Sequence, residues 1–286
     1  MIGRIVFGIL LCSYLAVIIP FSTSLTDRPV VVKLGTLPDA ELLQIVAGDQ
    51  RYLMAQYAVV KVLFYYGTLV ETFNQKVPLQ PEYPAMFRTL QTSSRLDPWN
   101  ADAYYFAQAA FTWELNKIDE VNEMLEYGME HRTWDYQLPF FAGFNSAYFR
   151  KDYAAAALYF KKAAELSGNQ LLANLSSRYF YESGQNKLGL DFIEYMQGHT
   201  TDRKLIEVYE LRKRALIGVI TIQGAIDRYS RSFGKAPSRI SDLTAAGVLA
   251  KVPADPYGGT FYLDEKGAVR STSKFALAAP AQQPAK

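Results

Sequence analysis

The run Asp152-Tyr-Ala-Ala-Ala-Ala-Leu-Tyr-Phe-Lys-Lys-Ala-Ala-Glu-Leu166 decides the fold of this chain of 286 residues. Small side chains recur in it at Ala156 and Ala163, and aromatic rings stand beside them at Tyr153 and Phe160. Two helices can come within packing distance only where small side chains mark the contact and large ones interlock around it. The run therefore predicts a helix that packs closely against a neighbouring helix along its alanine face.

Helix pairs with the same pattern recur on both sides of this run. One unit opens at Asn100 after Ser94-Arg-Leu-Asp-Pro98, the next contains the quoted run, and a more degenerate third unit ends near Met196. Each unit leaves an apolar face uncovered, so units of this kind stack on one another. The spacing resembles the tetratricopeptide (TPR) repeat of about 34 residues. The alternative is a generic helical bundle with the same alternation of small and large residues.

The last quarter of the chain has a different character. A long helical pattern over residues 202–232 precedes two short alternating segments, which flank the turn Asp264-Glu-Lys-Gly267 and predict a hairpin. The motifs Ala225-x-x-x-Tyr229, Gly234-x-x-Pro237, Leu243 and Asp255-Pro-Tyr-Gly258 resemble the globular half of type II secretion major pseudopilins. The prepilin processing motif and the calcium loop of such proteins are missing.

The amino terminus carries an uncharged stretch that follows Arg4 and runs from Ile5 to Thr26. About 20 apolar residues cross a bilayer as a helix, so this length predicts a transmembrane signal-anchor. A cleaved signal peptide is the alternative, since Ser22-Thr-Ser24 offers small residues for cleavage. A second apolar run, Leu53–Val70, contains Lys61 and is better interpreted as a buried helix of the folded domain.

These patterns together predict a mostly α fold in several parts. We expect an anchor or signal peptide at 1–26, a linker at 27–35 and a disordered tail at 276–286. Between them we expect a TPR-like α-solenoid of antiparallel helix pairs at 36–200, with an irregular opening pair. A small α+β domain, a long helix plus a β-hairpin, follows at 201–275.

Composition and motifs favour binding over chemistry. The net charge of +2 is close to balance and gives no sign of the clustered basic face that binds nucleic acid. The two histidines, His131 and His199, lie at predicted helix ends without partners at metal-ligand spacing, and Cys12 is the single cysteine. No phosphate loop or nucleophile motif is present. We therefore expect no enzyme activity, no cofactor and no metal site.

The TPR resemblance also implies a concave groove lined by the first helix of each unit. Transferred onto this sequence, the groove positions are Tyr105, Thr112, Trp113, Ser146, Phe149, Arg150, Asn174, Arg178, Tyr181 and Glu182. Aromatic rings beside arginine suit an extended peptide with apolar and acidic groups. Several of these side chains could instead be packed between units.

The leading hypothesis is a non-enzymatic scaffold that binds a partner protein in the groove. The apolar amino terminus places it on the outer, periplasmic face of a bacterial inner membrane, as a single-pass protein or as a periplasmic one if the segment is cleaved. The pseudopilin resemblance implies an envelope secretion or pilus-like assembly. One alternative is a structural subunit that copolymerises with a filament through its C-terminal domain, and a remote one is an enzyme with a cryptic site.

Overall fold

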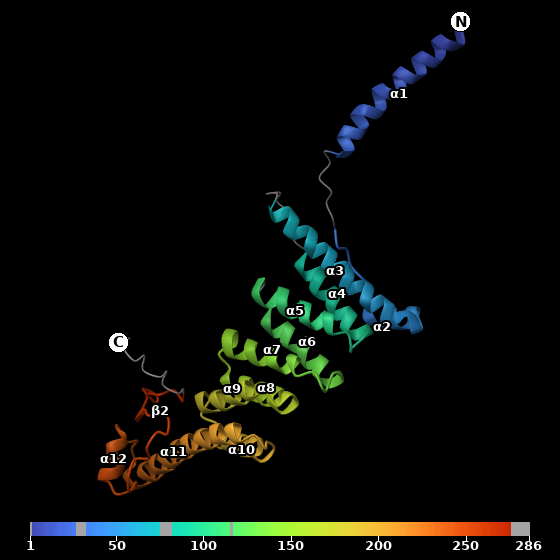
Figure 1. Ribbon diagram of the computed structural model, residues 1–286. Coiled ribbons are helices and arrows are strands. Elements are labelled where there is room, and N and C mark those ends of the chain that lie inside the picture. The colour runs from blue at the N-terminus through green and yellow to red at the C-terminus, as the bar shows by residue number, and fades with distance from the viewer. Residues whose placement is uncertain (1, 27–32, 75–81, 115–116, 276–286) are drawn as a thin grey trace, which may run out of the picture. The chain divides into compact units, whose positions relative to one another are not determined.

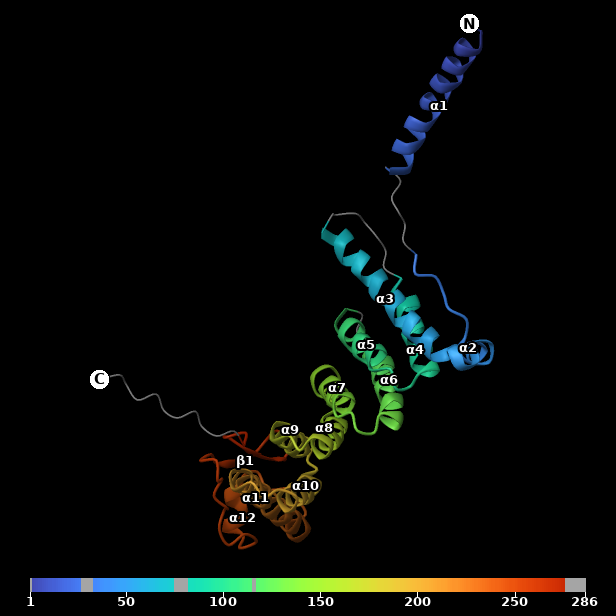
Figure 2. The same cartoon turned by 45° about the vertical axis from the view of Figure 1, so that its right-hand side comes forward.

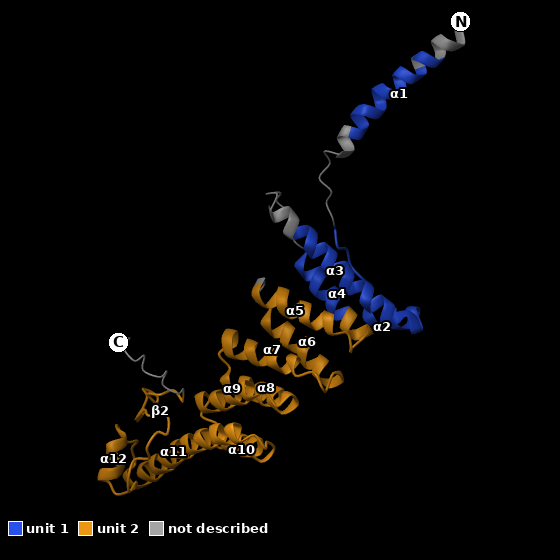
Figure 3. Ribbon diagram, in the orientation of Figure 1, with its two compact units in different colours: residues 1–92 blue, residues 93–286 orange. Residues whose placement is uncertain are grey.

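A computed structural model describes residues 2–26, 33–74, 82–114 and 117–275 (Figure 1). The described part of the chain is mostly helical and carries one two-stranded antiparallel sheet, which confirms the predicted mostly α class. It divides into two compact units, residues 1–92 and residues 93–286 (Figure 3). The predicted tail at 276–286 and most of the predicted linker, residues 27–32, lie outside the described residues.

The first unit is built from helices of unequal length. Its elements are α1 (Ile2–Thr26), α2 (Ala40–Ala47), the 3₁₀ turn η1 (Gly48–Gln50), α3 (Arg51–Asn74) and most of α4 (Tyr83–Leu96). Helix α3 buries Ala55, Ala58 and Val62 completely, whereas Phe64 on its other side is 75% exposed. The second apolar run therefore forms a helix that is buried on one side only.

The role predicted for the amino-terminal helix is wrong. Across the part of the chain that the structure describes, no helix combines the length and the apolar character needed to cross a membrane. This finding overturns the predicted transmembrane anchor at residues 5–26 and, with it, the localisation to a bacterial inner membrane. That prediction rests on the length of the uncharged run alone, and length alone does not make a membrane-spanning helix.

The second unit is a succession of helices in which each element from α5 to α11 contacts the next (Figures 1 and 2). Its helices are α5 (Ala101–Glu114), α6 (Ile118–His131), α7 (Gln137–Asn145), the π-helical turn η2 (Ser146–Arg150), α8 (Tyr153–Ser167), α9 (Gln170–Glu182), α10 (Asn186–Gly198), α11 (Arg203–Phe233) and α12 (Ile240–Ala245). Polar caps start several of them: the Asp152 carboxylate accepts a hydrogen bond from the Ala155 N–H, and Asn169 caps α9 in the same way.

Small residues mark the places where these helices meet, as the sequence predicts. Ala156 and Ala163 are fully buried. A Cβ added to Gly143 would lie 3.2 Å from the Phe160 ring, and one added to Gly189 would lie 3.0 Å from the Phe180 Cβ. Helices approach this closely only without a side chain at the crossing.

The last two elements that the structure describes form the predicted hairpin. Strand β1 (Phe261–Leu263) pairs antiparallel with β2 (Val269–Ser271), and Phe261 lies opposite Ser271. One Asp264 carboxylate oxygen accepts hydrogen bonds from the N–H groups of Lys266 and Ala268, and the other accepts one from Arg270 Nε at 3.0 Å. Asp264 therefore shapes the turn, as the sequence indicates.

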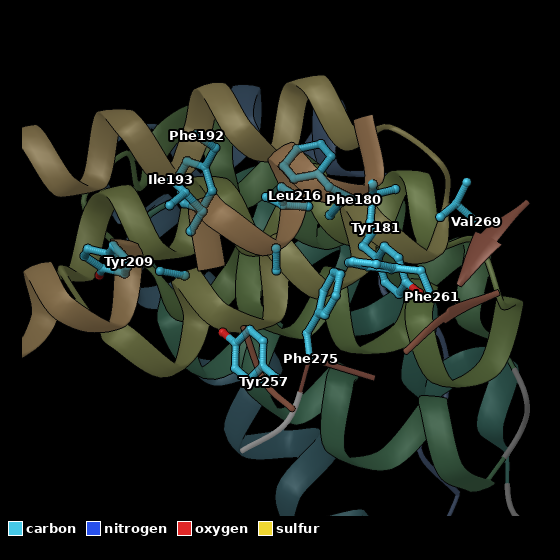
Figure 4. Packing of buried hydrophobic residues seen from close by; sticks show 14 of the residues in the cluster. Phe180, Tyr181, Phe192, Ile193, Tyr209, Leu216, Tyr257, Phe261, Val269 and Phe275 are labelled. Carbon is cyan, nitrogen blue, oxygen red and sulfur yellow. The ribbon is translucent and has the colours of Figure 1, made fainter. Parts of the chain in front are cut away.

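The hydrophobic core is continuous across the predicted boundary at residue 200. One cluster of buried side chains extends from Ala147 to Phe275, and Figure 4 shows part of it. Phe180 of α9 and Phe192 of α10 belong to it together with Leu216 of α11. Residues 201–275 therefore share their core with α8–α10 instead of enclosing one of their own.

Candidate protein-interaction site

Four aromatic side chains from α5, α7 and η2 form a cluster that we call the aromatic platform: Trp113, Phe144, Tyr148 and Phe149. The Trp113 and Phe149 ring centroids are 5.1 Å apart in an edge-to-face arrangement. The Phe144 and Tyr148 rings stack at 5.5 Å, and Tyr148 meets Phe149 edge to face at 4.9 Å. Such geometries add a favourable electrostatic contribution to the apolar contact.

The π-helical turn η2 places two of these rings. Consecutive residues Tyr148 and Phe149 both join the platform because the backbone at Ser146–Arg150 is wound more widely than an α-helix. Lys151 then takes a left-handed conformation with φ of 56°, and the Asp152 N–H donates to the Ser146 carbonyl at 3.0 Å, which ends the turn. π-Helical turns inside α-helical segments are frequent at functional sites.

The platform is open to solvent and carries positive charge at one side. Trp113 is 58% exposed and Tyr148 is 53% exposed. The Lys151 ammonium nitrogen lies 5.1 Å from the Tyr148 ring centroid. Arg150 pairs with Asp119 of α6 at 3.2 Å, which orients its side chain. Exposed aromatic groups of this kind, rimmed by charge, are typical of protein-interaction surfaces.

A buried polar network lies beneath the platform helices. The amides of Gln108 on α5 and Asn145 on α7 exchange hydrogen bonds, and Asn145 Nδ2 also donates to Asn122 Oδ1 of α6 at 2.8 Å. The Thr112 hydroxyl donates to Gln108 Oε1 at 3.2 Å. All four side chains are buried, so the network fixes the relative register of three helices.

The predicted groove residues of the first two units separate into two groups. Trp113 and Phe149 meet at the platform, and Arg150, the residue after Phe149, pairs with Asp119. Thr112 and Ser146 are buried in the interior and cannot line an open groove. Sequence spacing places residues on a helix face but does not reveal the polar network that draws Thr112 inward.

Tyr105 is also engaged within the fold. Its hydroxyl donates to Asp135 at 2.8 Å, and its ring meets Phe141 edge to face. Burial raises the pKa of Tyr105 to about 12, and the hydrogen bond with Asp135 adds to the rise. Tyr105 is therefore a neutral donor that holds the α6–α7 connection.

The groove residues of the third unit face the C-terminal hairpin. Tyr181 is buried, and its hydroxyl oxygen accepts a hydrogen bond from the Ser271 N–H at 2.8 Å. Glu182 accepts one from Arg270 Nη1 at 3.2 Å. Arg178 is exposed, and Asn174 is half-buried. The chain itself therefore occupies the positions at the end of α9 that a partner was expected to fill.

Two platform residues, Phe144 and Tyr148, were absent from the predicted groove. Their spacing of four residues is also that of two core positions on one helix face, so the sequence pattern favours core packing for both. The π-helical turn, which changes the helix face at this point, has no signal in the sequence that would have revealed it.

The described residues contain no group of three or more His, Cys, Asp or Glu side chains placed to hold a metal ion. The Nδ1 atoms of His131 and His199 lie 2.9 Å and 2.8 Å from the carbonyl oxygens of Tyr127 and Tyr195, each one turn earlier. Both imidazoles are therefore engaged at helix ends.

Comparison with known proteins gives no family assignment. No family model matches the chain, and no curated protein or solved structure is significantly similar to it. The site is therefore argued from its geometry.

Proposed function

We propose that this chain is a non-enzymatic protein-binding scaffold, and that the aromatic platform holds an extended segment of a partner protein. The observation that carries the proposal is the group of clustered rings at Trp113, Phe144, Tyr148 and Phe149, two of which are more than half exposed. Interface hot spots are enriched in tryptophan, tyrosine and arginine because these side chains bury large areas and still offer polar contacts.

The helix pairs α5/α6, α7/α8 and α9/α10 are proposed to be TPR-like units that present this platform. The buried alanines of α8 support the proposal, as do the close approaches at Gly143 and Gly189. In such a stack the first helix of each pair lies toward a common concave side. A groove of that kind accepts an extended peptide along the α5/α6 and α7/α8 units, because the C-terminal hairpin covers the end of α9.

The platform favours a peptide with apolar side chains and at least one carboxylate. Apolar groups would pack on the exposed Trp113 and Tyr148 rings, and a carboxylate would approach the Lys151 ammonium group. Burying one large apolar side chain on the rings would contribute about 1.5–3 kcal/mol to binding.

The test is selection of displayed random peptides on the immobilised full chain, followed by affinity measurement on purified variants. We expect the enriched peptides to lose about tenfold or more in affinity with Trp113→Ala and with Tyr148→Ala, as hot-spot residues do. Trp134→Ala is the matched control, since Trp134 is 61% exposed and lies outside the platform. Peptides whose affinity is insensitive to both platform variants, or a selection that enriches none, would refute the proposal.

A further inference from the structure

Helix α3 is apolar on two opposite sides, and the described residues cover only one of them. Ala55, Ala58 and Val62 on the covered side have no exposed surface. On the other side, large apolar side chains are exposed to solvent, and we call this set the α3 stripe: Tyr52, Leu53, Tyr57, Val60, Leu63 and Phe64. A helix that is apolar all round is normally buried all round. The α3 stripe is therefore expected to meet a second surface.

The α3 stripe is large enough for a stable interface. Leu53 is 65% exposed, Tyr57 is 53% exposed and Phe64 is 75% exposed. Because a large aromatic side chain carries about 150–250 Å² of surface, the whole stripe presents about 700 Å². This area exceeds the largest apolar patch of a typical monomeric protein, which is about 300–600 Å². Two copies that covered each other's stripe would bury about 1,400 Å², within the range of about 1,200–2,000 Å² for stable interfaces.

The composition of the stripe restricts the kind of partner. Between residues 51 and 69, the remaining exposed positions of α3 are Gln56 and Gly67, so no charged residue lies among them. Arg51 stands at the edge, where its Nη2 donates to the Tyr52 hydroxyl at 2.7 Å. The core of a protein interface is likewise rich in Tyr and Phe and poor in charge. The partner surface must therefore be uncharged and apolar where it meets the stripe.

The spacing of the stripe fits a second copy of itself. Its central members are separated by four, three and four residues, in the order Leu53, Tyr57, Val60 and Phe64. This is the a/d spacing of helices that pack side by side. The order of intervals is the same from either end, so in an antiparallel pair Leu53 lies opposite Phe64 of the second copy. Tyr57 then lies opposite Val60, and each layer joins an aromatic ring to a smaller aliphatic side chain.

The two cations of this part of α3 favour the antiparallel direction. A parallel pair in register would bring Arg51 beside Arg51 of the other copy and Lys61 beside Lys61, and like charges repel. The antiparallel pair places the two Arg51 side chains at opposite ends. Gly67 extends the exposed side beyond Phe64, and no described atom lies within 4 Å of a Cβ added there. A second helix can therefore approach the backbone closely at that position.

We propose that the α3 stripe is a homodimer interface in which two copies of the chain pack their α3 helices antiparallel about a two-fold axis. A two-fold interface uses the same patch on both copies, so one self-complementary stripe is sufficient. The interface lies on the first unit and shares no residue with the aromatic platform on α5, α7 and η2. Failure of the dimer therefore leaves the scaffold proposal standing. A dimer would carry two platforms and would bind a partner with two suitable segments more tightly.

Sedimentation of the full chain in the analytical ultracentrifuge measures its mass, and we expect a dimer at micromolar concentration. Phe64→Glu should weaken the dimer by about a hundredfold or more, because the two-fold axis places the new charge in the contact twice. Phe64 is 75% exposed in the single chain, so the helix content of this variant should match the wild type. Leu171→Glu on α9 is the matched control, since Leu171 is 63% exposed and lies in the second unit.

Cysteine pairing tests the direction of the two helices. In a Cys12→Ser background, a mixture of Tyr57→Cys chains and Val60→Cys chains should oxidise to a dimer linked between position 57 of one copy and position 60 of the other. Parallel packing would instead link two chains of the Tyr57→Cys kind. Preferential formation of that product would overturn the proposal. A chain that stays monomeric at high micromolar concentration would do so too, as would a dimer that Phe64→Glu leaves intact.

Discussion

The side-chain amides of Gln108 and Asn145 face each other in the interior and exchange two hydrogen bonds. Gln108 Nε2 donates to Asn145 Oδ1 at 3.0 Å, and Asn145 Nδ2 donates to Gln108 Oε1 at 2.8 Å. Gln108 belongs to α5 and Asn145 belongs to α7. This reciprocal amide pair ties α5 to α7, the two helices that carry Trp113 and Phe144 of the aromatic platform.

Asn145→Ala should destabilise the chain by about 2–4 kcal/mol, because the Gln108 and Asn122 amides would be left buried without their partners. Urea unfolding followed by circular dichroism measures the loss. The double variant Gln108→Leu with Asn145→Leu should lose less than the two single leucine variants added together, since no amide of the pair then remains unpaired. Strict additivity would contradict the coupling.

Gly189→Ala should cost about 1–3 kcal/mol, since the new methyl group would collide with the Phe180 Cβ on a packed helix. Gly198→Ala at the end of the same helix is the control, because no atom lies within 4 Å of an added Cβ there. We expect that variant to gain about 0.4–1 kcal/mol through the reduced freedom of the unfolded chain. Equal effects of the two substitutions in urea unfolding would argue against a close crossing of α9 and α10.

The helices were predictable from the sequence because their signals are local. Ala156 and Phe160 lie at helical spacing, and capping residues such as Asp152 and Asp202 precede the helices that they start. The hairpin was predictable for the same reason, since Asp264 and Gly267 stand in one turn. Each of these features depends on residues only a few positions apart.

The site was predictable only in part because it depends on contacts between distant residues. Trp113 and Phe149 meet across 36 positions, and only a helix face could be assigned to each from spacing. Tyr181 is covered by Ser271 and Phe275, which lie about 90 residues further along the chain. The docking of the hairpin on α9 has no local signal, so Tyr181 and Glu182 were placed in an open groove.

The Asp264 turn should make the hairpin sensitive to acid. Burial alone would raise the pKa of this carboxyl, but hydrogen bonds from Ala268, Arg270 and Lys266 outweigh it and hold the pKa below the ordinary 3.8. A carboxyl with a lowered folded pKa stabilises the fold above its unfolded pKa, and this contribution is lost as pH falls through the folded value.

The stability difference between wild type and Asp264→Asn should therefore be largest near neutral pH and shrink as pH falls below about 4. Urea unfolding across that range measures it. Glu265→Gln removes one negative charge from the same turn and serves as the control, because no hydrogen bond of the Glu265 side chain is present among the described contacts. A difference that stays constant down to low pH would show that Asp264 acts without its charge.

Tyr181 should hold the hairpin on α9 through one hydrogen bond and one ring contact. Its hydroxyl oxygen accepts the Ser271 N–H at 2.8 Å, and its ring centroid lies 4.4 Å from that of Phe275. Tyr181→Phe keeps the ring contact but leaves the buried N–H unpaired, which should cost about 1–2 kcal/mol.

The loss should be local to the hairpin. Amide hydrogen exchange of Ser271 should quicken in Tyr181→Phe, while exchange within α5 and α6 stays as in the wild type, because the main contacts of these two helices are with each other and with α7. Tyr179→Phe on the same helix is the control, since the Tyr179 ring stacks on Phe160 instead of meeting β2. Unchanged exchange at Ser271 would mean that the hairpin is held by the Phe275 contacts and the Arg270–Glu182 ion pair alone.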